Sequence, residues 1–189
     1  MIERKIIYFS KPGKKNTDAT LTASKERAEL LGINKFVVAT NSGETALKCA
    51  ELLKGNGREV IAVTLAAGRW KAHCPPEKNK LEEIRNLGGQ VLTATHLFVG
   101  NIGMAIRERF GGLSDSELIG HTLYRFSQGV KVAVEIAVMA ADAALVSPDE
   151  EVIAIAGTDR GADTALVLVP AYSNEFFKLK VREIIAMPR

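Results

Sequence analysis

The sequence predicts an α/β protein with three layers, in which helices cover both faces of a mostly parallel central sheet. Within the first hundred residues, short and continuously apolar runs alternate with segments of helical spacing. Strands that are apolar throughout are typical of parallel sheets buried on both faces. Two further apolar runs lie close together near the carboxyl end, beyond a very apolar helical stretch. No linker or internal repeat interrupts this pattern, so we expect a single domain over residues 1–189.

Apolar runs bounded by glycine, proline or polar clusters mark the predicted strands. Residues 6–9 form the first run, and we expect it to be a buried strand. The loosely alternating segment 179–187 is expected to add a strand at an edge of the sheet. The other predicted strands lie at 35–39, 59–64, 91–98, 152–156 and 164–169.

Capping and stop residues mark the predicted helices. Ser114-Asp115-Ser116-Glu117 is a capping box, in which the first serine and the glutamate satisfy backbone N–H groups where a helix begins. Asn16 or Thr17 can cap a helix that runs to about Leu31 and stops at Gly32. Further helices are expected at about 43–53, 80–87 and 128–145.

The composition excludes several classes of protein. Twenty-five Lys and Arg residues against 22 Asp and Glu give a net charge of +3, and the basic residues are scattered, so nucleic acid is not an expected partner. The two cysteines, Cys49 and Cys74, are too few and too far apart for a disulfide framework or a zinc module. No histidine cluster has metal-ligand spacing, and we predict no metal site. Cys49 lies in an apolar helical stretch and is expected to be buried.

The longest apolar stretch, 130–146, is expected to be a buried helix rather than a membrane span. It contains Lys131, Glu135 and Asp142, and three charges in such a window disfavour insertion into a bilayer. No signal peptide opens the chain, so we expect a soluble cytoplasmic protein. Because the helix is apolar nearly all round, it is buried either within the chain or against a partner, which leaves homo-oligomerisation open.

The strongest local signal for a binding site is the run Thr40-Asn41-Ser42-Gly43-Glu44-Thr45-Ala46, which follows a strand and opens a helix. Backbone N–H groups at a helix start, together with the helix dipole, attract an anion such as phosphate. Thr40, Ser42 and Thr45 can donate further hydrogen bonds, and Gly43 lets the backbone approach a ligand closely. The alternative is an ordinary helix cap, in which Ser42 satisfies its own helix and nothing binds.

A second signal is the polar run Gly157-Thr158-Asp159-Arg160-Gly161-Ala162-Asp163-Thr164 between two apolar strands. This run is longer than a tight hairpin needs, and polar loops on rigid strands often contact ligands. We expect Arg160 to meet a phosphate, and Asp159 or Asp163 to accept from a ligand hydroxyl or ring N–H. A solvated loop with ordinary turn chemistry is the alternative.

The loop after the first predicted strand is a third candidate. In open α/β sheets, ligands bind outside the carboxyl ends of the strands, where this loop and Thr64 are expected to lie. Lys11, Asn16 or Thr17 are the candidate contacts. A solvated basic loop followed by a helix cap is the alternative.

Two of these segments carry a family resemblance. The run from Val37 to Ala46, followed by Arg58 to Thr64, resembles the C-terminal domain of pyruvate kinase, and the glycine-rich loop from Gly157 to Val169 is similar to a late loop of that domain. The segments that match cover under half of the chain. When the order of the predicted strands is included, the resemblance extends to about two thirds of it. It implies a pyruvate kinase C-terminal domain-like fold with a phosphate pocket. In pyruvate kinases, the loop that corresponds to Thr40–Thr45 can hold a sugar phosphate as an allosteric effector. Pyruvate kinase activity is not expected, because these residues include no catalytic barrel.

The chain also resembles stand-alone archaeal and bacterial proteins of this type, which look like FMN binders. The resemblance implies FMN as the ligand, with its phosphate at the Thr40–Thr45 helix start. The flavin ring needs apolar or aromatic walls with a few polar contacts. The candidate walls, each of which is also a candidate for the core, are Trp70, Phe98, Tyr124 and Phe126.

We therefore expect a protein that binds a phosphorylated small molecule, with FMN as the expected cofactor. Three alternatives stay open at this point. The first is a flavin-dependent oxidoreductase that uses the same site. The second is a sugar-phosphate sensor without flavin. The third is an assembly domain with an empty pocket.

Overall fold

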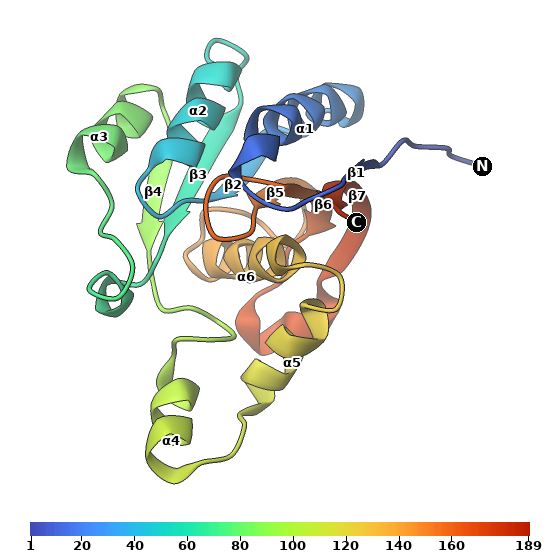
Figure 1. Cartoon of the computed structure of the whole chain (residues 1–189). Helices are drawn as coiled ribbons and strands as arrows, with labels where there is room; N and C mark the ends of the chain where they lie inside the picture. The colour runs from blue at the N-terminus through green and yellow to red at the C-terminus, as the bar shows by residue number, and fades with distance from the viewer.

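The computed structural model describes residues 1–189 and confirms the α/β architecture (Figure 1). At its centre is a seven-stranded sheet in the order β1-β7-β6-β5-β2-β3-β4. All neighbouring strands are parallel except that β6 runs antiparallel to both β5 and β7. The strands are β1 (Ile7–Phe9), β2 (Lys35–Ala39), β3 (Glu59–Thr64), β4 (Gln90–Thr93), β5 (Val152–Ala156), β6 (Thr164–Val169) and β7 (Lys180–Pro188).

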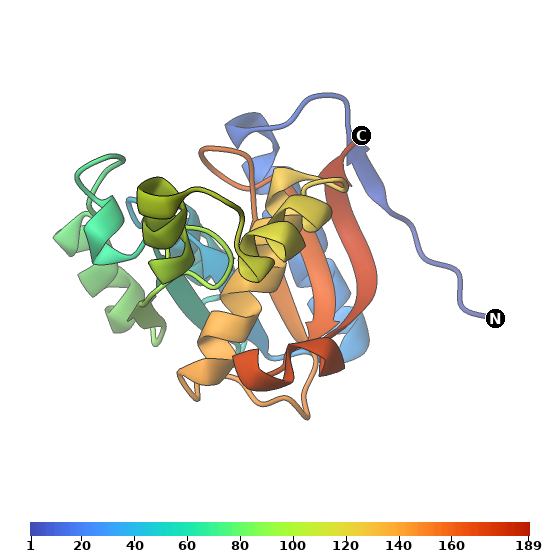
Figure 2. The ribbon, with the colours of Figure 1, turned by 90° about the horizontal axis from the view of Figure 1, so that it is seen from below.

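Helices cover both faces of this sheet, which completes the three layers (Figure 1). On one face lie α1 (Thr17–Leu31), α2 (Glu44–Leu53) and α3 (Lys78–Asn86). On the other face α6 (Gln128–Asp142) packs against β5, β2 and β6, and α5 (Asp115–Leu123) packs against α6. Figure 2 shows α6 lying across the strands. The remaining elements are α4 (Ile102–Phe110) and the 3₁₀ helices η1 (Lys14–Asn16), η2 (Ala67–Arg69) and η3 (Ser173–Lys178).

The central strands are apolar at every position because both of their faces are buried. Phe36 and Val38 of β2 join the core beneath α1 and α2, whereas Val37 between them joins the core beneath α6. All three side chains are at most 1% exposed. This explains why the strands could be recognised as continuous apolar runs.

Most of the predicted elements are confirmed. Strands β2, β3, β5 and β6 have the predicted bounds. Helix α1 ends at Gly32, whose φ of +70° provides the left-handed cap. The capping box is present at the start of α5, where Ser114 and Glu117 each accept from the other's backbone N–H.

The ends of the sheet differ from the prediction. Segment 179–187 was expected at an edge, but the strand that it largely forms, β7, lies inside the sheet between β1 and β6. The edge strand is β1, which was expected to be buried, and its Tyr8 is 55% exposed. Pairing partners depend on contacts between distant segments, which no local pattern encodes. The fourth strand ends at Thr93 instead of Phe98, so His96 lies in the loop that follows it.

Helix α6 is buried within its own chain, which accounts for its apolar composition. Twelve of its fifteen residues are buried, including Lys131 and Glu135. The helix ends at Asp142, and no helix of the protein has the length and hydropathy that crossing a bilayer requires. The apolar surface of α6 therefore needs no partner subunit to bury it, and homo-oligomerisation stays a prediction.

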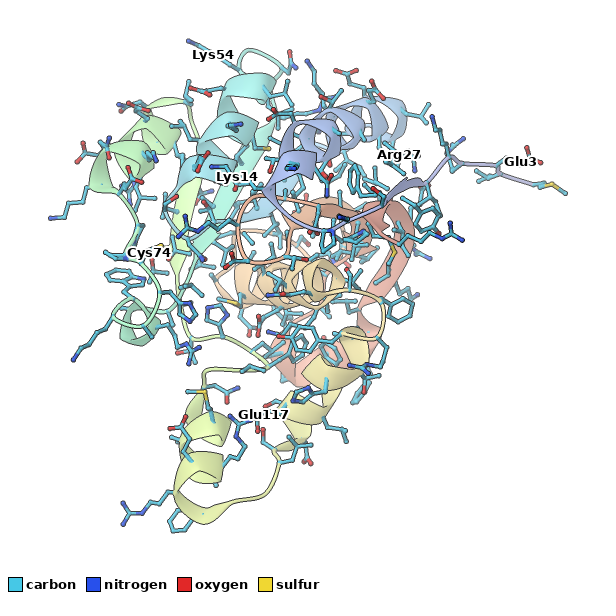
Figure 3. All side chains as sticks on the ribbon, in the orientation of Figure 1. Glu3, Lys14, Arg27, Lys54, Cys74 and Glu117 are labelled. Atoms are coloured by element: carbon cyan, nitrogen blue, oxygen red, sulfur yellow. The ribbon has the colours of Figure 1, made fainter.

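Helix α4, which the sequence pattern did not reveal, extends from the body with α5 (Figure 1). The buried Glu117 on α5 forms an ion pair of 2.5 Å with Arg107 on α4, and this pair joins the two helices (Figure 3). Hydrogen bonds from the Ser114 backbone and side chain, with the charge of Arg107, lower the pKa of Glu117 although burial opposes them. The apolar side chains Ile102, Ile106 and Phe110 are exposed on α4.

Candidate functional site

A cavity of about 590 Å³ lies at the carboxyl ends of the central parallel strands. Thr40 after β2 and Thr64 at the end of β3 line it, together with the first residues of α2 and the loop after β5. Helix α2 follows β2 on one face of the sheet, whereas α6 precedes β5 on the other face. The direction of winding thus changes between β2 and β5, and such switch points are the usual ligand sites of open α/β sheets.

The amino end of α2 borders the cavity and has unused hydrogen-bond donors. Thr40 Oγ1 and Ser42 Oγ accept the first two N–H groups of this turn, at 3.1 Å and 3.4 Å. The N–H groups of Thr45 and Ala46, which follow, have no acceptor within the chain. The helix dipole adds partial positive charge at this end. These two N–H groups are therefore suited to an anionic oxygen.

Gly43 has a structural role that the sequence did not reveal. Its φ of +101° is a left-handed conformation, and a Cβ at this position would lie 2.9 Å from the Cβ of Lys80. Gly43 is absent from the cavity lining. The glycine is therefore needed for the turn and for the packing of α2 on α3, and its role in the close approach of a ligand stays a prediction.

The loop after β5 presents Asp159, Arg160 and Gly161 to the cavity. Asp159 has a φ of +62°, and the N–H of Arg160 donates to the carbonyl of Thr158 at 2.8 Å. This hydrogen bond and the positive φ describe a tight γ-turn, a strained conformation that is rare outside functional loops. Asp159 and Arg160 are exposed, so both side chains are free to meet a ligand.

Asp163, at the base of the same loop, is a structural anchor. Its side chain is fully buried, and its carboxylate accepts from the N–H groups of Gly13 and Thr158 at 2.8 Å and 3.1 Å. It also accepts from Thr164 Oγ1 at 2.9 Å. Of the two aspartates expected to accept from a ligand, only Asp159 reaches the cavity.

A buried charged cluster at one side of the cavity was not anticipated. Glu135 on α6 accepts from Lys131 Nζ at 2.6 Å, and its Oε2 lies 3.3 Å from His96 Nδ1. Its other oxygen accepts from the Phe98 N–H at 2.8 Å. Burial raises the pKa of Glu135, but the hydrogen bond from His96 and the charge and hydrogen bond of Lys131 outweigh it and hold the pKa below its ordinary value. Glu135 is therefore ionised at neutral pH.

The segment between β3 and α3 supplies another wall that the sequence did not reveal. Arg69, His73, Cys74 and Glu77 all line the cavity. Arg69 Nη2 lies 3.2 Å from His73 Nε2. Cys74 lies in the part of this segment that has no regular secondary structure (Figure 3). Nothing in the spacing of these residues distinguishes them from an ordinary polar loop.

The cavity has a surplus of unpaired positive charge. Arg69 and Arg160 have no carboxylate partner, against one unpaired acid, Asp159. Each glutamate of the lining is paired with a lysine, in the pairs Lys14–Glu44, Lys80–Glu77 and Lys131–Glu135. Two guanidinium groups without a carboxylate partner and a helix amino end favour an anionic ligand.

Comparison with known families agrees with the fold. The family described as the pyruvate kinase alpha/beta domain matches residues 18–168. The chain belongs to this family. The match includes the strands β2, β3 and β5 beside the cavity, and it confirms the family resemblance inferred from the sequence.

Two solved structures show a distant likeness to this pyruvate kinase alpha/beta domain. A crystal structure of an O-ureido-L-serine-bound mutant of O-ureido-L-serine synthase has 18% identity and a TM-score of 0.32, covering 72% of this chain and 49% of that one. A second structure of O-ureido-L-serine synthase has 17% identity, the same TM-score and the same coverage. The chain thus spans about half the length of these enzymes, and a likeness this weak carries no argument about function.

Most of the aromatic side chains predicted as walls for a flavin ring lie outside the cavity lining of this pyruvate kinase alpha/beta domain. Phe98 is 1% exposed and belongs to the core, whereas Phe126 is 61% exposed. Trp70 donates from Nε1 to the carbonyl of Leu65 at 2.8 Å and is absent from the cavity lining. Of the four candidates only Tyr124 lines the cavity.

The fifteen residues predicted for the site divide into two groups. Lys11 is exposed away from the cavity, and Thr17, also considered, is buried and accepts from the Ala162 N–H at 3.0 Å. Those that line the cavity are Thr40, Asn41, Ser42, Glu44, Thr45, Thr64, Gly157, Asp159, Arg160 and Gly161. Those outside the lining are Lys11, Gly43, Thr158, Asp163 and Thr164.

Proposed function

We propose that the cavity binds a phosphorylated small molecule, with its phosphate at the amino end of α2. The observation that carries this proposal is the pair of unused N–H groups at Thr45, which lines the cavity, and at Ala46, which follows it in α2. Arg160 lines the same cavity. Backbone donors at a helix start and a free guanidinium group are the two features that phosphate binding uses most. The hydroxyl of Thr40 accepts from the Gly43 N–H, and its own O–H stays available to donate to the phosphate beside these backbone groups.

FMN is the specific ligand that we propose. A cavity of about 590 Å³ is within the range that holds molecules of cofactor size. Val99, Val132, Ile136 and Tyr124 offer apolar surface for a flavin ring. The buried Nε2 of His96 lacks a partner within the chain, and a polar edge of the ring would supply one. Bound FMN would supply electron-transfer chemistry, so a flavin-dependent oxidoreductase is included in this proposal.

A sugar phosphate without flavin is the second candidate, and the polarity of the lining favours it. Only eight of the 26 lining residues are hydrophobic. Asn41, Gln128 and Asp159 offer the amide and carboxylate groups that sugar hydroxyls use. A protein that binds such a ligand would act as a sensor, as the effector loop of pyruvate kinases implies.

Three measurements separate these candidates. The first is the visible absorption of the freshly purified protein, with the mass of any molecule released on denaturation. The second is a calorimetric titration of the colourless protein with FMN and with riboflavin, which lacks the phosphate. Binding of FMN with at least tenfold weaker binding of riboflavin is the expected result. Equal affinity would exclude the phosphate cradle, and binding of a sugar phosphate alone would favour the sensor. The third is reduction of bound FMN by a nicotinamide cofactor, which would distinguish an oxidoreductase from a passive binder.

A further inference from the structure

The buried carboxylate of Glu135 fixes the orientation of His96. It accepts from Lys131, from the Phe98 N–H and from His96 Nδ1, so both of its oxygens accept hydrogen bonds. The side chains of Glu135 and Lys131 are 1% and 5% exposed, and that of His96 is 12% exposed. All three residues line the cavity. Glu135 and Lys131 hold each other in place, because neither can turn away without leaving a buried charge unpaired, and the contact with Glu135 orients the ring of His96.

The same contact determines which nitrogen of His96 bears the proton. An ionised carboxylate only accepts hydrogen bonds, so His96 Nδ1 carries the hydrogen that it donates to Glu135. In the neutral ring, Nε2 is then an acceptor with a free lone pair. The Nε2 atom is buried and has no partner within the chain. A buried polar atom that lacks a partner calls for a specific explanation, and a ligand is the one that its place on a cavity wall suggests.

We propose that His96 Nε2 is an acceptor that recognises a donor group, an N–H or O–H, on the part of the ligand remote from its phosphate. Glu135 is the positioning residue, since it holds the ring and its tautomer, and Lys131 keeps Glu135 charged. This inference rests on the proposed function and deepens it, because it limits the ligand to phosphorylated molecules that carry such a donor. The ring N–H of a flavin and the hydroxyl of a sugar both qualify.

The carboxylate–imidazole pair also suits proton transfer. When the ligand group gives up its proton, the proton moves to Nε2, and the imidazolium that forms is stabilised by Glu135. The ligand keeps the electron pair and becomes an anion. No oxidant or second substrate is needed for this step.

The test combines one measurement on the free protein with one on binding. Nitrogen-15 NMR of the imidazole rings reports the tautomer without any ligand. Calorimetry then compares FMN with inorganic phosphate for the wild type, for His96→Phe, and for His121→Phe as a matched control on an exposed histidine outside the cavity lining. Circular dichroism and urea unfolding confirm that the variants are folded. We expect an unprotonated Nε2 in the free protein. We also expect FMN binding to weaken by about tenfold in His96→Phe, with phosphate binding and the control unchanged.

Each outcome is decisive. A protonated Nε2 beside an unprotonated Nδ1 would overturn the inference, whatever FMN does. Unchanged FMN affinity in a folded His96→Phe protein would overturn it too, and would indicate that Nε2 accepts a hydrogen bond only from water. If the wild type binds phosphate but not FMN while the expected tautomer is present, FMN fails as the ligand and the acceptor role of Nε2 is supported.

Discussion

The carboxylate of Asp163 accepts a hydrogen bond of 2.8 Å from the backbone N–H of Gly13, which lies 150 residues earlier in the chain. The same carboxylate accepts from the N–H of Thr158. These bonds join the loop after β1 to the loop after β5. They thereby hold the base of the loop that presents Arg160 to the cavity.

Replacing Asp163 with alanine is expected to destabilise the protein. Two backbone donors and one hydroxyl would lose their buried acceptor, and each unsatisfied buried group costs about 1–3 kcal/mol. We expect the free energy of unfolding to fall by about 3 kcal/mol, measured by urea denaturation. Asp149→Ala is the control, because that side chain is exposed and makes no hydrogen bond, and it should change little. An Asp163→Ala protein as stable as the wild type would show that the loops are held by other contacts.

Gly43 and Gly55 provide a matched pair for the packing of α2 on α3. Both have positive φ, at +101° and +79°, but only a Cβ at Gly43 would meet another atom, the Cβ of Lys80 at 2.9 Å. Gly43→Ala should therefore reduce the free energy of unfolding by about 1 kcal/mol or more beyond the loss in Gly55→Ala. Equal losses in urea denaturation would show that α3 shifts to make room.

Thr45→Asp should weaken binding of phosphorylated ligands without unfolding the chain. The new carboxylate would lie at the amino end of α2, where it stabilises the helix but repels a phosphate. Affinity for FMN should fall at least tenfold in a calorimetric titration. Asn56→Asp adds the same charge beyond the other end of α2, away from the cavity, and should bind as the wild type does. Equal effects of the two substitutions would point to net charge instead of a local cradle.

The acid stability of the protein should depend on Glu135. Its pKa is lower in the folded chain than its ordinary value of 4.5, so the folded state binds fewer protons than the unfolded state in this range. The stabilisation is complete above the unfolded pKa and is lost as pH falls through the folded pKa. Urea denaturation between pH 7 and pH 3 should show this loss, and Glu135→Gln should be less stable at pH 7 with a shallower acid slope. An unchanged slope would place the acid sensitivity on other carboxylates.

The two thiols should react very differently. Burial raises the pKa of Cys49 to about 12, and its side chain belongs to the core. Cys74 is half-buried and lines the cavity. A thiol reagent should therefore modify one cysteine quickly in the native protein and the second only after unfolding. Bound FMN should slow the first reaction, and identical rates with and without bound FMN would place the ligand elsewhere.

The sheet was largely predictable because its central strands are buried on both faces. Runs such as 35–39 and 152–156 are apolar at every position, and their bounds are those of β2 and β5. The position of β7 was not predictable, because it depends on pairing with β1, which is far away in the sequence. Helix α4 was not predicted, because it buries no residue. It therefore lacks the stripe of core-facing apolar residues from which the periodicity of a helix is recognised.

The site was predictable only where a local pattern signals it. The residues at the start of α2 and in the loop after β5 follow strands and have polar, glycine-containing patterns. The cluster of His96, Lys131 and Glu135 forms only when the loop after β4 folds against α6. One signal was present: Lys131 and Glu135 are four residues apart in an otherwise apolar helix, which places them on one face as a buried ion pair.

The amide signals of Thr45 and Ala46 provide the decisive measurement on the proposed phosphate cradle. In a nitrogen-15 NMR titration, FMN should shift these two signals most among the backbone amides, because their N–H groups gain an acceptor. Riboflavin, which has the same ring without the phosphate, should leave them nearly unchanged. Saturable binding of FMN that leaves both signals in place would contradict the assignment of the phosphate to the amino end of α2.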